Sequence, residues 1–338
     1  MRKGTLLRIV LIVTLSFTLL AAGYRAQQGQ EPPVTITPVT ISPGQVATLH
    51  WYAANQTTQF PLGAGFPAGI AFDGENLWVA DLSGNIIKVR PSDGTILATH
   101  TVPHAYVIAY DGANLWTTDC DDNVVNKVRP TDGTILGTFP VGSCVAALVF
   151  DGANIWVGAH NIIKLRASDG AMLGSFDIGN TGSNPSQGIA FDGINIWASN
   201  TGTNSSPQHT VTKLRASDGQ ILGKFVVGDA PEAMAFDGFS IWVSNNNSRS
   251  VTQLRASDGL TLGTFTVGTL PNGIGFDGAN IWVANSGSNS VTRIRVSPFG
   301  AGPRLQTFAI GNCPINGVAF DGANVWVTNG CSATVSKL

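Results

Sequence analysis

The chain is a succession of short apolar segments separated by turn-forming residues. In one representative stretch the apolar segments are residues 233–236, 241–243, 251–255 and 262–267, and Asp-Gly or Asn-rich turns lie between them. Segments of this length bounded by Gly, Asp and Asn are typical of β-strands joined by tight turns. None of them has the 3.6-residue period of an amphipathic helix, so the pattern predicts an all-β fold.

The same four-strand pattern repeats seven times. Each repeat contains an aromatic residue followed by Asp-Gly, and successive Asp residues are 38 to 45 positions apart. A Trp follows each of these Gly residues by four positions. Four short strands in about 41 residues are typical of a β-propeller blade. We therefore predict a seven-bladed β-propeller of four-stranded blades, with the repeated tryptophans in its core: Trp78, Trp116, Trp156, Trp197, Trp242, Trp282 and Trp326.

The last repeat contains only three strands, and the missing one is found near the N-terminus. Residues 58–63 (Thr-Gln-Phe-Pro-Leu-Gly) resemble residues 137–142, which form a fourth strand in their own repeat. We expect this N-terminal strand to complete the C-terminal blade and close the ring. Residues 46–49 are an alternative third strand for that blade. We favour residues 334–338, because their sequence fits the repeat better.

The N-terminal residues precede the repeats and have a different composition. Arg2, Lys3 and Arg8 are followed by an uncharged apolar stretch over residues 9–23, which is short for a membrane span and is typical of a secretory signal peptide. We predict a signal peptide over residues 1–23, an extended linker over 24–45 and the propeller over 46–338. The alternative is an uncleaved anchor. After cleavage we expect no membrane span and a secreted, periplasmic or cell-surface protein.

Charge and cysteine content narrow the class of protein further. The chain has 19 basic and 21 acidic residues without a basic stripe, which argues against a nucleic-acid partner. Its four cysteines are expected in loops. A disulfide needs Cα atoms within about 7 Å, which disfavours the other two pairings, because these would join blade 2 or 3 to blade 7 across blade 1. We therefore predict the pairs Cys313–Cys331 and Cys120–Cys144. Free thiols are the alternative.

The repeat itself resembles a known family. The unit Gly-Ile-Ala-Phe-Asp-Gly-x-Asn-Ile-Trp-Val-Ala-Asn, followed by Val-Thr-Lys-Leu-Arg-Ala-Ser-Asp-Gly, resembles bacterial YVTN/NHL-like β-propeller repeats over roughly residues 46–338. Streptogramin B lyases are similar at a greater distance. The resemblance implies the propeller fold. Since related proteins serve as binding modules, scaffolds and some enzymes, it does not select one function.

Candidate functional residues lie in the loops after the second and fourth strands of each blade. If the strands are lettered a to d, these loops form one face, which we call the b–c/d–a face. The third residue after the repeated Trp is polar in every blade except the third, where it is Ala159. These polar residues predict a ring on this face. The ring could hold a ligand or serve only to stabilise turns. Its polar members are Asp81, Asp119, Asn200, Asn245, Asn285 and Asn329.

Four residues break the repeat at positions where packing does not require them. His104 and Glu232 lie in loops that join blades, His160 lies in the shortest b–c loop and His209 in the longest. A His/Glu pair can bind a metal or act as acid and base. Residues 119–123 contain three Asp residues. An EF-hand calcium loop that began at Asp119 would need Gly at its sixth position and Glu at its twelfth, and the sequence has neither. We interpret residues 119–123 as a solvated loop.

These observations predict a non-catalytic binding or interaction scaffold, with a protein, peptide or saccharide partner, no cofactor and a monomeric state. The alternative from another class is a metal-assisted lyase or lactonase-like enzyme, which would use His104, His160 or Glu232 with a divalent cation. A third hypothesis is a structural protein of the cell envelope.

Overall fold

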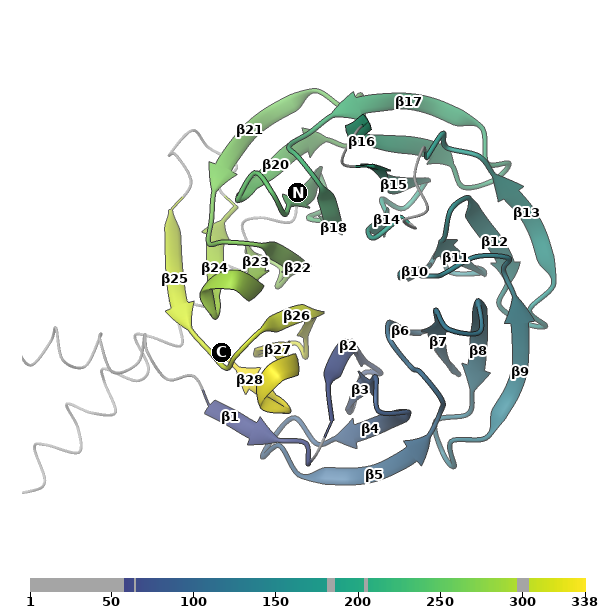
Figure 1. Ribbon diagram of the computed structural model, residues 1–338, viewed down its shortest axis with the longest axis vertical. Helices are drawn as coiled ribbons and strands as arrows, with labels where there is room; N and C mark the ends of the chain where they lie inside the picture. The colour runs from purple at the N-terminus through teal and green to yellow at the C-terminus, as the bar shows by residue number, and fades with distance from the viewer. Residues whose placement is uncertain (1–57, 64, 181–185, 204–205, 297–303) are drawn as a thin grey trace, which may run out of the picture. The chain divides into compact units, whose positions relative to one another are not determined.

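The computed structural model describes residues 58–63, 65–180, 186–203, 206–296 and 304–338. These residues form seven four-stranded antiparallel sheets around a central axis, which confirms the predicted seven-bladed β-propeller (Figure 1). In this part of the chain, no helix has the length and apolar character needed to cross a membrane. The predicted signal peptide, the linker and the competing strand at residues 46–49 lie outside the described residues.

Each blade is a meander whose first strand lies nearest the axis (Figure 1). Blade 1 consists of β2 (Pro67–Phe72), β3 (Leu77–Asp81), β4 (Asn85–Val89) and β5 (Ile96–Thr101). Blade 2 consists of β6 (Ile108–Tyr110), β7 (Leu115–Asp119), β8 (Val124–Val128) and β9 (Ile135–Pro140). Blade 3 consists of β10 (Ala147–Phe150), β11 (Asn154–Gly158), β12 (Ile162–Arg166) and β13 (Met172–Phe176).

The remaining blades follow the same order from the axis outward. Blade 4 consists of β14 (Ile189–Phe191), β15 (Asn195–Thr203), β16 (Ser206–Arg215) and β17 (Ile221–Val226). Blade 5 consists of β18 (Pro231–Phe236), β19 (Ser240–Asn245), β20 (Ser250–Arg255) and β21 (Thr261–Thr266). Blade 6 consists of β22 (Pro271–Phe276), β23 (Asn280–Asn285), the 3-10 turn η1 (Ser286–Ser288), β24 (Ser290–Arg295) and β25 (Leu305–Ala309). Blade 7 consists of β26 (Pro314–Phe320), β27 (Val325–Asn329), the 3-10 turn η2 (Gly330–Ser332), β28 (Thr334–Lys337) and β1 (Thr58–Pro61).

The ring closes through the N-terminal strand, as predicted. β1 pairs antiparallel with β28, with Thr58 opposite Lys337, and the sheet order is β1-β28-β27-β26. β28 therefore fills the third position of the last blade. Phe60 of β1 packs on Trp326 with ring centroids 5.5 Å apart, as Phe139 packs on Trp116 at 5.6 Å. The closing blade is thus built like the others.

Each repeated Asp holds the repeated Trp of its own blade. In blade 3, Asp151 Oδ1 accepts hydrogen bonds from the amides of Ala153 and Asn154, and Oδ2 accepts one from Nε1 of Trp156. The indole-to-carboxylate bond is 2.6 to 2.8 Å long in all seven blades. A buried indole N–H needs a hydrogen-bond acceptor. One carboxylate therefore both fixes the a–b turn and accepts the hydrogen bond of the buried Trp.

The apolar core lies between neighbouring blades. The Trp156 ring contacts both the ammonium of Lys164, 5.0 Å from its centroid, and the ring of Phe176, whose centroid is 5.6 Å away. Nζ of Lys164 also donates a 2.7 Å hydrogen bond to the carbonyl of Ala216 in blade 4. Gly219, in the next blade, has a φ of +75°, and a Cβ there would lie 1.9 Å from the Phe176 ring. The Gly of the Ser-Asp-Gly turn is therefore required for both its conformation and the contact between blades.

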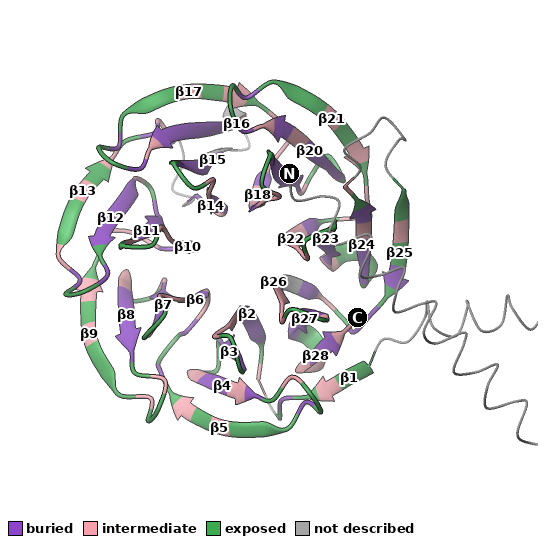
Figure 2. Cartoon of the chain, turned by 180° about the vertical axis from the view of Figure 1, so that it is seen from behind, coloured by how far each residue is buried: buried purple, intermediate pink, exposed green. Residues whose placement is uncertain are grey.

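The outermost strands are the most exposed part of each blade (Figure 2). In β9, β17 and β21 the first two residues are exposed and later residues alternate. The pairing register also shifts next to these exposed residues, for example between Lys127 and Val128 opposite β9. Such bulges interrupt an otherwise free edge, which disfavours pairing with another chain.

Candidate functional site

The two faces of the propeller are built differently. On one face, the a–b turn contains Asp-Gly in every blade, and a Ser-Asp-Gly or Thr-Asp-Gly turn follows strand c in the first five. On the b–c/d–a face the d–a connections differ in length: residues 102–107 and 141–146 are longer than residues 227–230 and 267–270. The b–c connections are similar in length but differ in residues, as in 120–123, 246–249 and 286–289. Turns that serve packing repeat in sequence, whereas these connections vary. A functional site is therefore expected on the b–c/d–a face.

The predicted polar ring is buried. Its six polar members are at most 1% exposed, and the described contacts of their side chains are internal. For example, Nδ2 of Asn245 donates to the hydroxyls of Ser250 and Thr252, while its Oδ1 accepts from the amide of Gly228. Asn245 thus ties strand c and the incoming d–a loop to the end of strand b. Asp81, Asp119, Asn200, Asn285 and Asn329 occupy the same position in their blades.

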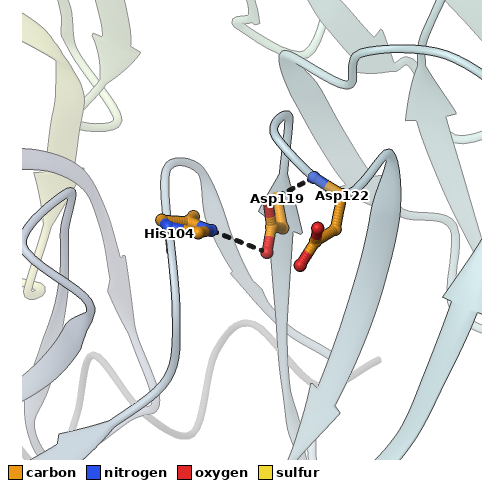
Figure 3. Close-up of side chains that lie close together, drawn as sticks. All are labelled: His104, Asp119 and Asp122. Carbon is orange, nitrogen blue, oxygen red and sulfur yellow. Dashed lines mark hydrogen bonds and ion pairs between the residues drawn. The ribbon is translucent and has the colours of Figure 1, made fainter.

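One member of this ring takes part in a cluster of ionisable side chains. Asp119 ends β7, its side chain is 2% exposed, and its Oδ1 accepts hydrogen bonds from the amides of Asp121 and Asp122, both 3.0 Å. Its Oδ2 lies 3.4 Å from Nδ1 of His104. Figure 3 shows His104 reaching Asp119 from the loop between β5 and β6, with the Asp122 carboxylate beside them. The ligand atoms of His104, Asp119 and Asp122 all lie within 4.8 Å of one another.

The cluster borders a pocket and a disulfide. A shallow pocket of about 230 Å³ is lined by Leu82, His104, Tyr106, Cys120 and Asp121. Cys120 is bonded to Cys144 in the following d–a loop, which anchors the acidic turn to blade 3. The second disulfide joins Cys313 to Cys331. The structure thus contains both predicted pairs, and no cysteine of the described residues is free.

The other candidate residues lie apart from this cluster. His160 is exposed, and its amide donates to the Ser143 hydroxyl at 3.1 Å. Glu232, expected in a loop between blades, lies instead on β18, because this strand already begins at Pro231. Burial there raises the pKa of its carboxyl to about 7. Within the described residues, the one group of three or more His, Cys, Asp or Glu side chains close enough to share a cation is that of His104, and it contains neither His160 nor Glu232.

The expected longest b–c loop is largely a hairpin. β15 and β16 extend the second and third strands of blade 4 to 9 and 10 residues. His209, expected in a loop, lies on β16, and its Nδ1 is 3.1 Å from a carboxylate oxygen of Asp229. The expectation was wrong because Thr201 pairs with His209 and Thr203 with Ser206 across the hairpin, although Thr and Ser in such a stretch are typical of a loop.

The association of His104 with the acidic turn was not predicted from the sequence. The two are 15 positions apart, and the chain returns through all of β6 and β7 between them. A comparison of blades contained the necessary information. Asp121 and Cys331 each follow the Trp of their own blade by five positions. His104 and Cys313 each precede strand a and have a φ of 49°. A pair that forms a disulfide in blade 7 therefore has its counterpart in His104 and Asp121.

Comparisons with known proteins identify the fold. No family model matches the chain, and no curated protein matches it either. Among solved structures, hydrazine synthase of Kuenenia stuttgartiensis is similar with a TM-score of 0.68 at 16% identity, over 83% of this chain and 97% of that one. The structure of U3-55K is similar with a TM-score of 0.69 at 13% identity, over 84% and 98%. At such low identity, these likenesses show a shared β-propeller fold alone.

Proposed function

We propose that this protein is a non-catalytic binding scaffold that engages a protein, peptide or saccharide partner through its b–c/d–a face, and that its repeats are of the YVTN/NHL type. The observation that carries the proposal is the contrast between the two faces. The a–b turns, and the c–d turns of the first five blades, repeat the same residues, whereas on the other face the d–a connections differ in length and the b–c connections differ in residues. Variation confined to one face of a rigid scaffold is typical of a recognition surface.

The chemistry of the varied face supports recognition. Phe66, Leu82 and Leu270 lie in its loops and are 36%, 39% and 45% exposed. These exposed apolar side chains supply contacts that an interface can bury. Because Ile194 and Phe239 are exposed on the opposite face, the disulfides and the varied connections are what distinguish the b–c/d–a face. Both disulfides restrain loops of this face. A restrained loop loses little conformational entropy when a partner binds, which favours affinity.

The same disulfides support an extracytoplasmic location. Stable disulfides are typical of secreted and periplasmic proteins. Together with the predicted signal peptide, they favour an exported scaffold.

Site-specific photocrosslinking tests the proposal. A photoreactive benzoyl-phenylalanine is introduced at Leu82 or Leu270 on the b–c/d–a face, and at Ile194 or Phe239 in a–b turns on the opposite face. These control side chains are 72% and 62% exposed. In cells that naturally make the protein, we expect a discrete adduct from the first pair and none from the second. Adducts only from Ile194 or Phe239, or from no position, would refute the proposed surface.

A further inference from the structure

We propose that His104, Asp119 and Asp122 form a binding site for a divalent transition-metal ion, with Zn²⁺ as the class it fits best. The site does not depend on the scaffold function proposed above. It rests on one imidazole and two carboxylates whose ligand atoms lie within 4.8 Å of one another (Figure 3).

The buried carboxylate of Asp119 favours a bound cation. Its side chain is 2% exposed, and both described backbone donors bond to Oδ1, leaving Oδ2 facing Nδ1 of His104. A buried carboxylate is normally paired with a cation or bound to a metal. None of the described Lys or Arg side chains forms an ion pair with this turn, which also carries Asp121 and Asp122. Three carboxylates thus have one imidazole as their basic partner.

The distance between His104 and Asp119 suits two ligands of one ion. Two ligands of a tetrahedral ion with bonds of about 2.1 Å are separated by roughly 3.4 Å. The distance from His104 Nδ1 to Asp119 Oδ2 is 3.4 Å, which is longer than an ordinary hydrogen bond but suits two ligands of one ion. Asp122 is exposed, so its side chain can rotate to shorten its distance to the other two. Three protein ligands leave a fourth position for water or for a ligand from a partner.

The other imidazole nitrogen of His104 faces a third carboxylate. Nε2 of His104 lies 3.7 Å from a carboxylate oxygen of Asp121. A metal-binding His generally presents its second nitrogen to a carboxylate, which orients the ring and strengthens the ligand. Asp121 is therefore placed to orient His104, while Asp119 approaches the opposite nitrogen.

The corresponding positions of blade 7 show that the backbone brings these two loops together. Cys313 and Cys331 occupy the places of His104 and Asp121, and their Cα atoms are 5.3 Å apart. In blade 6 the same places hold Leu270 and Gly287, where a Cβ on the glycine would lie 3.1 Å from the leucine side chain. Of blades 2, 6 and 7, only blade 2 has ionisable side chains at these two positions. A bound ion would join the two loops of blade 2 as the disulfide joins those of blade 7.

The donor set selects the class of ion. Imidazole nitrogen is a common ligand of zinc and other first-row transition metals, whereas calcium and magnesium prefer all-oxygen sites of six or more ligands. One nitrogen and two carboxylate oxygens fit a three-ligand zinc site, and the acidic turn lacks the Gly and the final Glu of an EF-hand.

Metal titration tests the site. Chelator-treated, oxidised protein (residues 24–338, without a His tag) is titrated by calorimetry with ZnCl₂, CaCl₂ or MgCl₂. We expect one Zn²⁺ per chain, no calcium or magnesium binding at the same concentration, and a Co²⁺ derivative with the intense visible absorption of tetrahedral coordination. His104→Ala and Asp122→Asn should each weaken Zn²⁺ binding at least tenfold. His160→Ala, which removes another exposed imidazole of the same face, should change it less than twofold.

Several results would overturn the proposal. Zn²⁺ binding below half an equivalent, or binding that survives both His104→Ala and Asp122→Asn, would exclude these ligands. Binding of Ca²⁺ in place of Zn²⁺ would exclude the assigned class of ion. Both substitutions alter exposed side chains, so circular dichroism and the thermal midpoint of the chelated variants serve as the folding control.

Discussion

The bond between Asp and Trp in each blade gives the most direct test of how the repeat is stabilised. We consider Asp151→Ala. The substitution removes two backbone-amide bonds and leaves the indole N–H of Trp156, which is fully buried, without its acceptor. An unsatisfied buried donor costs about 1–3 kcal/mol, and the lost bonds to a charged acceptor add to this. We therefore expect a destabilisation of about 2–4 kcal/mol, or a fall in thermal midpoint of roughly 5–10 °C.

Asp169 supplies a matched control in the same blade. It also accepts a backbone amide bond, from Ala171, and it faces Arg166, but it is exposed and holds no buried donor. We expect Asp169→Ala to lower the midpoint by less than about 1 °C, since exposed ion pairs contribute little. Both variants are compared by differential scanning calorimetry with intact disulfides. Equal losses from the two substitutions would refute the assignment of the stabilisation to the indole bond.

Three further outcomes follow from the fold. Burial raises the pKa of Glu232 from 4.5 to about 7, so the free energy of unfolding falls as pH rises through this range. In urea titrations, Glu232→Gln should raise the free energy of unfolding by up to about 3 kcal/mol at pH 8 and leave it unchanged at pH 4. Deleting residues 24–63 removes β1 and should abolish cooperative thermal unfolding, whereas deleting 24–44 should leave it almost unchanged; equal effects would contradict the closure. Replacing Cys313 and Cys331 together by Ser should cost about 3 kcal/mol for a loop of 18 residues, and an unchanged midpoint would contradict a stabilising bridge.

The architecture was predictable because the repeat makes seven copies of the same packing problem. The position of each Trp, the match between residues 58–63 and 137–142, and the order of the blades were enough to predict the core, the closing strand and both disulfides. The Asp residues were predicted only as turn formers. Their bond to the indole depends on a distance across five residues that the spacing alone does not specify.

The site was less predictable, because position along a strand does not fix the direction of a polar side chain at its end. Asn245 is placed on the predicted face, yet its amide turns inward to hydroxyls on β20, since a buried amide gains bonds there. The cluster at His104 depends on two loops of different strands meeting, and nothing in the local sequence of either loop indicates the other.

The closure by β1 has a consequence for how the molecule is made. Thr58 pairs with Lys337, so the earliest strand of the ring has no neighbour until nearly the whole described sequence has been synthesised. Contacts of such long range are formed slowly, and an unpaired strand is a template for wrong pairing in the meantime. During synthesis, β1 is therefore open to wrong pairing until β28 has been made. Chaperones that bind unpaired strands should be most important in that period.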